Sequence, residues 1–139
     1  MELLDPFYHL FIGFANVRRH LGCNLRARYP PRQWNEETQN ELHRFFSILE
    51  SSRAMAESKH NDEGWLFGSF SGADAFYFPV VARLRTYRVE IDPIKFTRAA
   101  AYVKKVWVQP LVNEFMLRAR KSDFHRPQYD AIYEGMTIE

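Results

Sequence analysis

The sequence is poor in the features that mark secreted or membrane-spanning proteins. Cys23 is the only cysteine among 139 residues, so no internal disulfide can form. No Cys-His-Asn signature surrounds Cys23, and we expect it to be a small buried residue rather than a nucleophile. No apolar run approaches the roughly 18 residues that a membrane span needs. The N-terminus also lacks the basic region and small-residue cleavage site of a signal peptide. These absences predict a soluble, cytoplasmic protein.

Charge and histidine placement exclude further classes. The 19 basic and 17 acidic side chains leave a net charge of +2, which is too balanced to indicate a nucleic-acid-binding protein. The five histidines are scattered, and no pair at ligand spacing shares a helix with a carboxylate, so we predict no metal site. A local group of arginines fits either a solvated helix end and loop or a phosphate-binding patch: Arg18, Arg19, Arg26, Arg28 and Arg32.

The composition that is present is that of one folded domain. Hydrophobic residues make up 46% and aromatic residues 16% of the chain, which is enough for a single core with bulky walls. Apolar residues recur at helical spacing between Leu3 and Leu21, and again from a helix start near Asn35 to about Ala56. Later helices are predicted from Ser71, from Asp92-Pro93 and from Pro110.

No convincing strand accompanies these helices, and the apolar run at residues 65–68 has no second strand to pair with. The sequence therefore predicts an all-α, compact bundle of about five helices. We assign residues 1–121 to this domain and residues 122–139 to a polar C-terminal tail. The tail either wraps the surface or is disordered.

The helix that begins at Ser71 has the clearest local signals. Ser71 and Asp74 have the Ser-x-x-Asp spacing of a capping box. Capping accounts for both residues, so a hydrolase interpretation is not needed. Apolar residues follow on almost every side, including Phe76 and Tyr77, and this helix is predicted to be the central, most buried one.

Residues 66–87 also carry an ungapped pattern of identities. They are Leu66, Phe67, Gly68, Phe70, Ser71, Ala73, Asp74, Ala75, Pro79, Val80, Arg83, Thr86 and Tyr87. The pattern closely resembles a motif of the glutathione transferase C-terminal domain, in which the Ser-x-x-Asp pair caps the central helix. The resemblance implies the all-helical fold of that domain.

Weaker similarity extends the resemblance over almost the whole chain, to about residue 121. Upstream, Gly13-Phe14, Val17-Arg18 and Asn24 resemble a bacterial-type family motif, from which Phe11, Ile12, Gly22 and Cys23 depart. Downstream, Tyr102-Val103 and Pro110 resemble the last helices of the family, followed by Phe115, where the family usually has Trp. A whole family member begins with a thioredoxin-like half, and no βαβ pattern for that half occurs in this sequence.

The resemblance implies a different role for each of the two halves. The thioredoxin-like half binds glutathione and activates its thiol, so we expect no catalytic residue and no cofactor in this chain, with glutathione a co-substrate only when that half is supplied. The helical half walls the apolar substrate pocket, and the corresponding positions are Phe7, Phe11, Phe14, Arg18 and Tyr77. The alternative is that these residues simply fill the core.

Two functions follow from the resemblance. In the first, the chain is the substrate-binding half of a glutathione transferase, inactive by itself. In the second, it is a non-catalytic protein-interaction module of the same fold. In either case we expect an exposed apolar face that meets a thioredoxin-like chain or a second copy, and we expect neither nucleic acid nor membrane as a partner.

Overall fold

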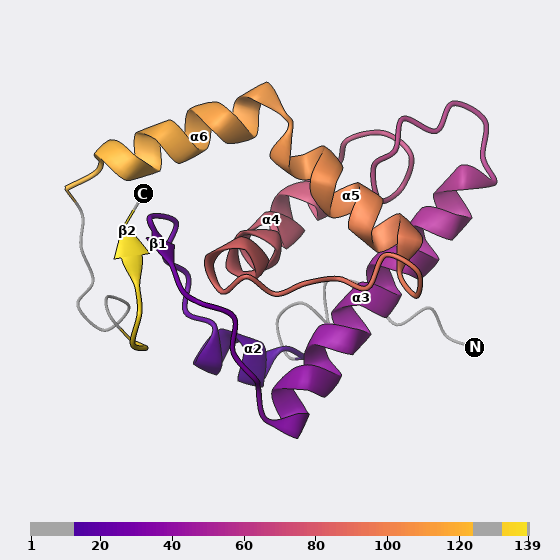
Figure 1. Ribbon diagram of the computed structural model, residues 1–139. Helices are drawn as coiled ribbons and strands as arrows, with labels where there is room; N and C mark the ends of the chain where they lie inside the picture. Colours follow the sequence, from indigo (N-terminus) through magenta and orange to yellow (C-terminus); the bar gives the residue numbers. More distant parts are fainter. Residues whose placement is uncertain (1–12, 124–131, 139) are drawn as a thin grey trace.

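The computed structural model describes residues 13–123 and 132–138, and in these ranges it consists of helices with one very small sheet (Figure 1). In chain order the elements are α2 (Ala15–His20), β1 (Ala27–Arg28), α3 (Glu36–Glu57), α4 (Gly72–Thr86), α5 (Thr97–Trp107), α6 (Pro110–Lys121) and β2 (Thr137–Ile138). The predicted all-α bundle is confirmed. No helix in the described ranges is long and apolar enough to cross a membrane.

Helix α3 is the longest element, and its start follows from local chemistry. The side chain of Asn35 caps it by accepting the backbone N–H of Thr38 at 3.0 Å. Glu36 and Glu37 lie in its first turn, where the positive end of the helix dipole favours them. Its predicted apolar face is buried: Leu42, Phe45, Phe46 and Leu49. In Figure 1, α2 lies beside the N-terminal half of α3 and α5 lies against its C-terminal half.

Helix α4 contributes more buried residues than any other described helix, as predicted. Tyr77, Val80, Val81 and Leu84 follow the i, i+3, i+4, i+7 spacing and face the core. The expectation that Phe76 is also interior is wrong, because 48% of its surface is exposed. One helical step of about 100° turns Phe76 away from the stripe that begins at Tyr77.

Helix α5 begins later than predicted. Asp92 does not cap it; the Asp92 carboxylate instead accepts the N–H groups of Ile94 and Lys95 at 2.8 and 3.2 Å and closes a turn. The helix starts at Thr97, and its first N–H groups donate to Glu50 of α3. The prediction at Pro110 is right, since that proline is the first residue of α6.

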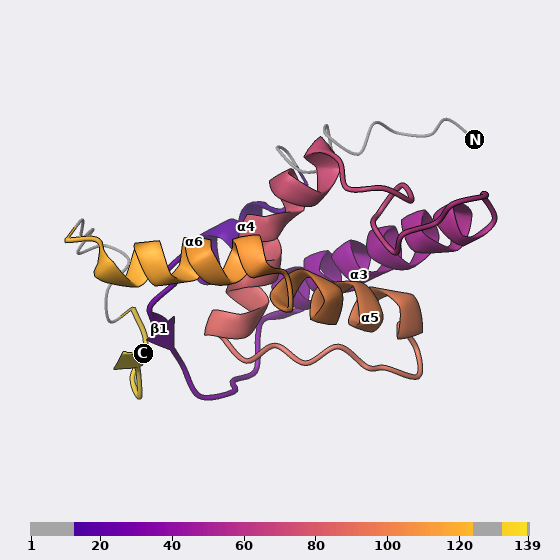
Figure 2. The same ribbon diagram turned by 90° about the horizontal axis from the view of Figure 1, so that it is seen from above.

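The sheet was not foreseen from the sequence. β1 and β2 pair antiparallel, with Ala27 opposite Ile138 and Arg28 opposite Thr137. Nearby, the N–H of Ile132 donates to the Tyr29 hydroxyl at 3.2 Å. The described end of the predicted tail, residues 132–138, therefore wraps the surface beside β1, one of the two alternatives left open above. Figure 2 shows α6 and this segment at the same end of the molecule.

Candidate functional site

Asp74, at the start of α4, is the centre of a buried hydrogen-bond cluster. Its side chain is only 3% exposed. Oδ2 accepts the N–H of Ser71 at 2.8 Å and the Ser71 hydroxyl at 3.1 Å, and both halves of the capping box are present. Oδ1 accepts the N–H of Leu66 at 3.1 Å and the hydroxyl of Tyr102 at 3.1 Å. One carboxylate thus joins α4 to the preceding loop and to α5.

The tyrosines near this cluster remain neutral phenols. Burial, with the negative charge of Asp74 beside it, raises the pKa of Tyr102 far above its ordinary value. Burial also raises the pKa of Tyr77. Neither hydroxyl is therefore poised to act as a base near neutral pH, and the cluster around Asp74 fits a structural role.

An apolar groove of about 570 Å³ opens beside Asp74, between the first half of α4, the end of α5 and the start of α6. Aromatic rings wall it in two pairs. Trp65 and Phe70 meet edge to face with centroids 5.0 Å apart, and Phe78 and Phe115 do so at 5.6 Å. Leu111 of α6 borders the groove and is 70% exposed. The groove is the right size and chemistry for an apolar ligand.

The predicted pocket-wall residues are only partly described. Phe7 and Phe11 lie outside the described residues. Phe14 and Tyr77 are 1% and 2% exposed, and both pack against Phe45, with ring centroids 5.9 and 5.5 Å from the centroid of that ring. Arg18, in the last turn of α2, is exposed. The structure therefore joins Phe14 and Tyr77 through the core, and their role as a pocket wall stays a prediction.

The other residues singled out from the sequence do not come together at one site. Cys23 is exposed, contrary to the expectation of burial. It lies in the loop after α2, where the carbonyls of the two preceding residues, Leu21 and Gly22, accept hydrogen bonds from the side chains of Arg83 and Tyr87.

The arginine group does not act as one patch. Arg32 lies 3.6 Å from the ring centroid of Tyr133, whereas Arg28 lines a different cleft at the end of α4. Among the described residues, no three His, Cys, Asp or Glu side chains are grouped so as to hold a metal ion.

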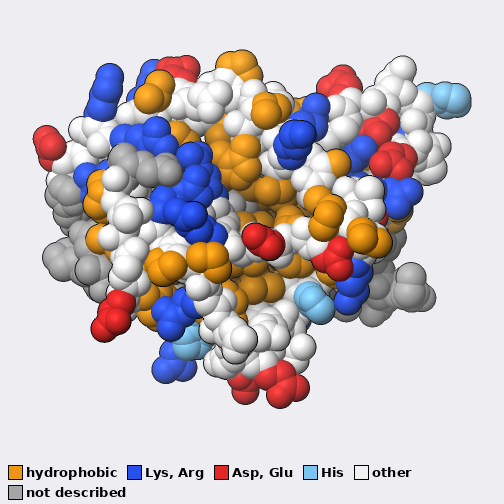
Figure 3. All heavy atoms as spheres, in the orientation of Figure 1, with side chains coloured by type: hydrophobic (Ala, Val, Ile, Leu, Met, Phe, Trp, Pro, Cys, Tyr) orange, Lys and Arg blue, Asp and Glu red, His pale blue; other side chains and the backbone are white. Residues whose placement is uncertain are grey.

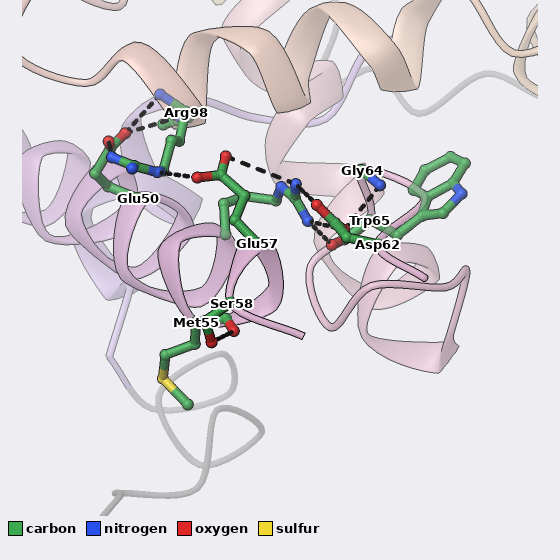
Figure 4. A network of polar contacts seen from close by, with 10 residues as sticks. Glu50, Met55, Glu57, Ser58, Asp62, Gly64, Trp65 and Arg98 are labelled. Carbon is green, nitrogen blue, oxygen red and sulfur yellow. Dashed lines mark hydrogen bonds and ion pairs between the residues drawn. The ribbon is translucent and has the colours of Figure 1, made fainter. Parts of the chain in front are cut away.

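A charged network at the backbone of Trp65 holds the loop that leads into α4 (Figure 4). Arg53 of α3 pairs with Asp62 at 2.7 Å and also donates to the carbonyl of Trp65. The hydrogen bond from Arg53, together with the N–H of Gly64, lowers the pKa of Asp62 to about 2. Trp65 therefore presents its ring to the groove from a loop held at its base.

Sequence reasoning missed several residues that build this region. Tyr102 was placed in the final helices only by resemblance, and its bond to Asp74 has no sequence signal. Phe78 and Phe115 were not linked, because they lie on separate helices. Both residues are apolar and lie in predicted helices, but the surface that each side chain faces depends on how α4, α5 and α6 pack.

Comparison with known proteins agrees with this geometry. The sequence model described as "Glutathione S-transferase, C-terminal domain" matches residues 32–105, which is more than half of the chain and includes α3, α4 and the Asp74 cluster. No curated protein and no solved structure matches the chain significantly. By this match and its helical architecture, the chain belongs to the glutathione S-transferase C-terminal domain family.

Proposed function

We propose that this chain is the helical, substrate-binding half of a glutathione transferase. The observation that carries the proposal is the family match over residues 32–105, which contains the buried capping cluster of Ser71 and Asp74. The aromatic groove beside that cluster adds support, because an apolar electrophile fits such a surface. In this proposal Arg18 and the predicted residues Phe7 and Phe11 add to the substrate wall, and Phe14 and Tyr77 support it from the core.

The chemistry then requires a second half. The glutathione thiolate is the nucleophile, and lowering its pKa needs a donor or a positive field at the sulfur. The proposal assigns that task, and glutathione binding, to a thioredoxin-like half. The isolated chain is accordingly inactive and binds glutathione only when that half is supplied.

The test is a calorimetric titration of the chain with glutathione, paired with a conjugation assay on a small aromatic electrophile. We expect neither heat nor turnover from the chain alone. We then expect turnover when the chain is fused to the glutathione-binding half of a characterised transferase whose own helical half has been removed. Turnover by the isolated chain would contradict the proposal, as would a correctly folded fusion that binds glutathione yet never conjugates any of a panel of electrophiles.

A specific observation favours one alternative, a non-catalytic interaction module. Three large apolar side chains of α6 are exposed: Leu111, Phe115 and Leu117. Leu111 and Phe115, four residues apart, lie on one face of α6, and an exposed apolar surface of this kind suits a partner, either a thioredoxin-like chain or a second copy. Sedimentation of the wild type and of a Leu111→Glu/Phe115→Glu variant distinguishes these partners. Self-association that the variant abolishes supports a second copy, and a monomeric wild type excludes it.

A further inference from the structure

The polar groups of the groove beside Asp74 restrict what it binds. Its lining contains one carboxylate, from Asp74, and one carboxamide, from Gln109, among otherwise apolar residues. No lysine or arginine of the described ranges lines it. The group of Lys and Arg side chains visible in Figure 3 lies beside a different hollow, the cleft at the end of α4. An anionic ligand would therefore meet a like charge in the groove and no cation to offset it.

Asp74 supplies negative charge to the groove but no free acceptor. Its two oxygens accept four hydrogen bonds, from the N–H groups of Leu66 and Ser71 and the hydroxyls of Ser71 and Tyr102. These bonds fill the roughly four acceptor positions of a carboxylate. Arg53 interacts electrostatically with Asp74 but is itself paired with another carboxylate, that of Asp62. The field of Asp74 thus favours the positive end of an N–H or O–H group without bonding to it.

Gln109, between α5 and α6, supplies the free acceptor. Its Nε2 atom donates to the backbone carbonyl of Lys105 at 3.0 Å, which fixes the nitrogen end of the carboxamide and so identifies the oxygen end. No described residue donates to Oε1, an oxygen that has two acceptor lone pairs. A ligand that carries a single N–H or O–H therefore finds an acceptor on the edge of an apolar surface.

The apolar surface that a ligand would cover comes from three exposed side chains. Phe70, Leu111 and Phe115 border the groove and are 56%, 70% and 48% exposed. Trp65 is already covered, since it is 9% exposed and the Lys105 ammonium lies 4.9 Å from its ring centroid. A flat aromatic ring packs well against exposed phenyl rings, and its binding removes their surface from water. The groove volume of about 570 Å³ accommodates such a ligand.

We infer that this groove binds an uncharged, flat aromatic compound with one N–H or O–H donor, which bonds to Oε1 of Gln109. The ring of the ligand covers Phe70, Leu111 and Phe115. Indole has this chemistry: its fused ring is apolar, and its only polar hydrogen lies on the ring edge. The inference rests on the proposed function in treating the groove as part of the substrate site, and it narrows the substrates of that site to neutral aromatic donors.

Titration calorimetry of the full chain with two matched ligand pairs tests this inference. Benzofuran has the shape of indole with an oxygen in place of the N–H, and we expect indole to bind about fivefold more tightly. Indole-3-carboxamide and indole-3-carboxylate differ mainly in charge, and we expect the neutral compound to bind at least about tenfold more tightly. Equal affinities within either pair would overturn the inference, as would an absence of indole binding.

These titrations contain no glutathione, so the inference and the proposed function fail separately. A chain that binds indole but gives no turnover in the fusion would contradict the proposed function alone. A fusion that conjugates an electrophile while the chain shows no preference for neutral donors would contradict the inference alone.

A pair of glutamine variants tests the acceptor. Gln109→Leu removes the carboxamide and keeps a side chain of similar size. Gln39→Leu is the matched control, because the exposed Gln39 also donates from Nε2 to a backbone carbonyl, that of Trp34, and lies outside the groove. We expect Gln109→Leu to bind benzofuran as the wild type does and to lose the preference for indole, which Gln39→Leu keeps. A preference retained in Gln109→Leu, or lost in both variants, would overturn the inference.

A second pair and a measurement on the unmodified chain locate the ring. Phe115→Ala should weaken indole binding at least about fivefold, whereas Leu117→Ala, at an exposed position on the same helix outside the groove lining, should not. Amide chemical shifts of the wild type should move in residues 70–78 and 106–115 during the indole titration. Equal losses in both variants would contradict the inference, as would shifts confined to residues 84–91 and 100–104, which border the cleft at the end of α4.

Discussion

The carboxylate of Glu50 accepts the backbone N–H of Ala99 at 2.9 Å, although 49 residues separate the two in sequence. The same oxygen accepts the N–H of Arg98 at 2.8 Å. Helix α5 has no acidic residue in its first turn, and Phe96 at its N-cap provides no side-chain acceptor. A residue of α3 therefore caps α5 through tertiary contact.

Glu41 does the same for α2. Its carboxylate accepts the N–H groups of Asn16 and Val17 at 3.2 and 2.8 Å. Glu41 and Glu50 are nine residues apart, so at about 100° per residue they point to opposite sides of α3. The longest helix thus fixes the start of one neighbour on each side.

The first prediction concerns this distant cap. Glu50→Ala should lower the free energy of unfolding by about 1–2 kcal/mol, because it leaves the first N–H groups of α5 without an acceptor. A thermal melt should show a midpoint lower by roughly 5 °C. Arg98→Ala removes only ion pairs with Glu50 and Glu57 and keeps the backbone cap, so its loss should be smaller. A larger loss in Arg98→Ala would show that the ion pairs, not the cap, matter.

The second prediction concerns the cluster at the head of α4. Asp74→Ala removes the acceptor of two buried donors, the N–H of Leu66 and the hydroxyl of Tyr102. Adding the loss of the cap, we expect a destabilisation of about 3 kcal/mol and a melting midpoint lower by roughly 10 °C. Asp123→Ala, at an exposed position, is the matched control and should leave the melt unchanged.

A double-mutant cycle separates the parts of that effect. Tyr102→Phe deletes only the hydroxyl that donates to Asp74. If the two residues interact as the structure shows, the Asp74→Ala/Tyr102→Phe variant should be less destabilised than the sum of the single variants. Strict additivity would mean that the hydrogen bond contributes nothing measurable.

The third prediction is a pH dependence at the loop before α4. The hydrogen bond from Arg53 and the N–H of Gly64 lower the pKa of Asp62 from 3.8 to about 2. A carboxyl with a depressed pKa in the folded state stabilises the fold above its unfolded pKa, and this contribution is lost as the pH falls through the folded pKa. The difference in melting midpoint between the wild type and Asp62→Asn should therefore be full near neutral pH and shrink between pH 3.8 and about 2. A difference that stays constant over that window would contradict the assignment.

Local chemistry in the sequence located most helix starts. Asn35, Ser71 and Pro110 each act on the turn that contains them, so their roles could be predicted without knowing the fold. Asp92 carries the same signal, but its carboxylate closes a separate turn, and the true start of α5 depends on Glu50 of another helix. Such a cap has no sequence spacing by which to recognise it.

The candidate site was harder to predict for a similar reason. The groove beside Asp74 joins Trp65 and Phe70 of a loop to Phe78 and Phe115 of two helices. Each residue is apolar, but only the packing of α6 on α5 and α4 decides that their rings border one hollow. Family resemblance named the helix and its capping box correctly, and it did not identify this surface.

The fourth prediction concerns the segment 132–138, which sequence analysis assigned to the tail. Tyr133 packs edge-on to Tyr29, Trp34 and Tyr87 and donates its hydroxyl to the carbonyl of His20 at 2.7 Å. Tyr133→Ala should destabilise the domain by about 2 kcal/mol, since it removes a half-buried ring and a hydrogen bond.

Tyr133→Phe keeps the ring and should retain most of the stability, losing about 1 kcal/mol for the hydrogen bond. Hydrogen exchange at the Ile132 amide, which donates to Tyr29, reports the same contact locally and should accelerate in Tyr133→Ala. A melt and an exchange rate both unchanged in that variant would mean that the segment rests on β1 without stabilising it. A lower melting midpoint and faster exchange in Tyr133→Ala, as expected, would place residues 132–138 within the cooperative fold, so that the helical domain extends past the predicted boundary at residue 121.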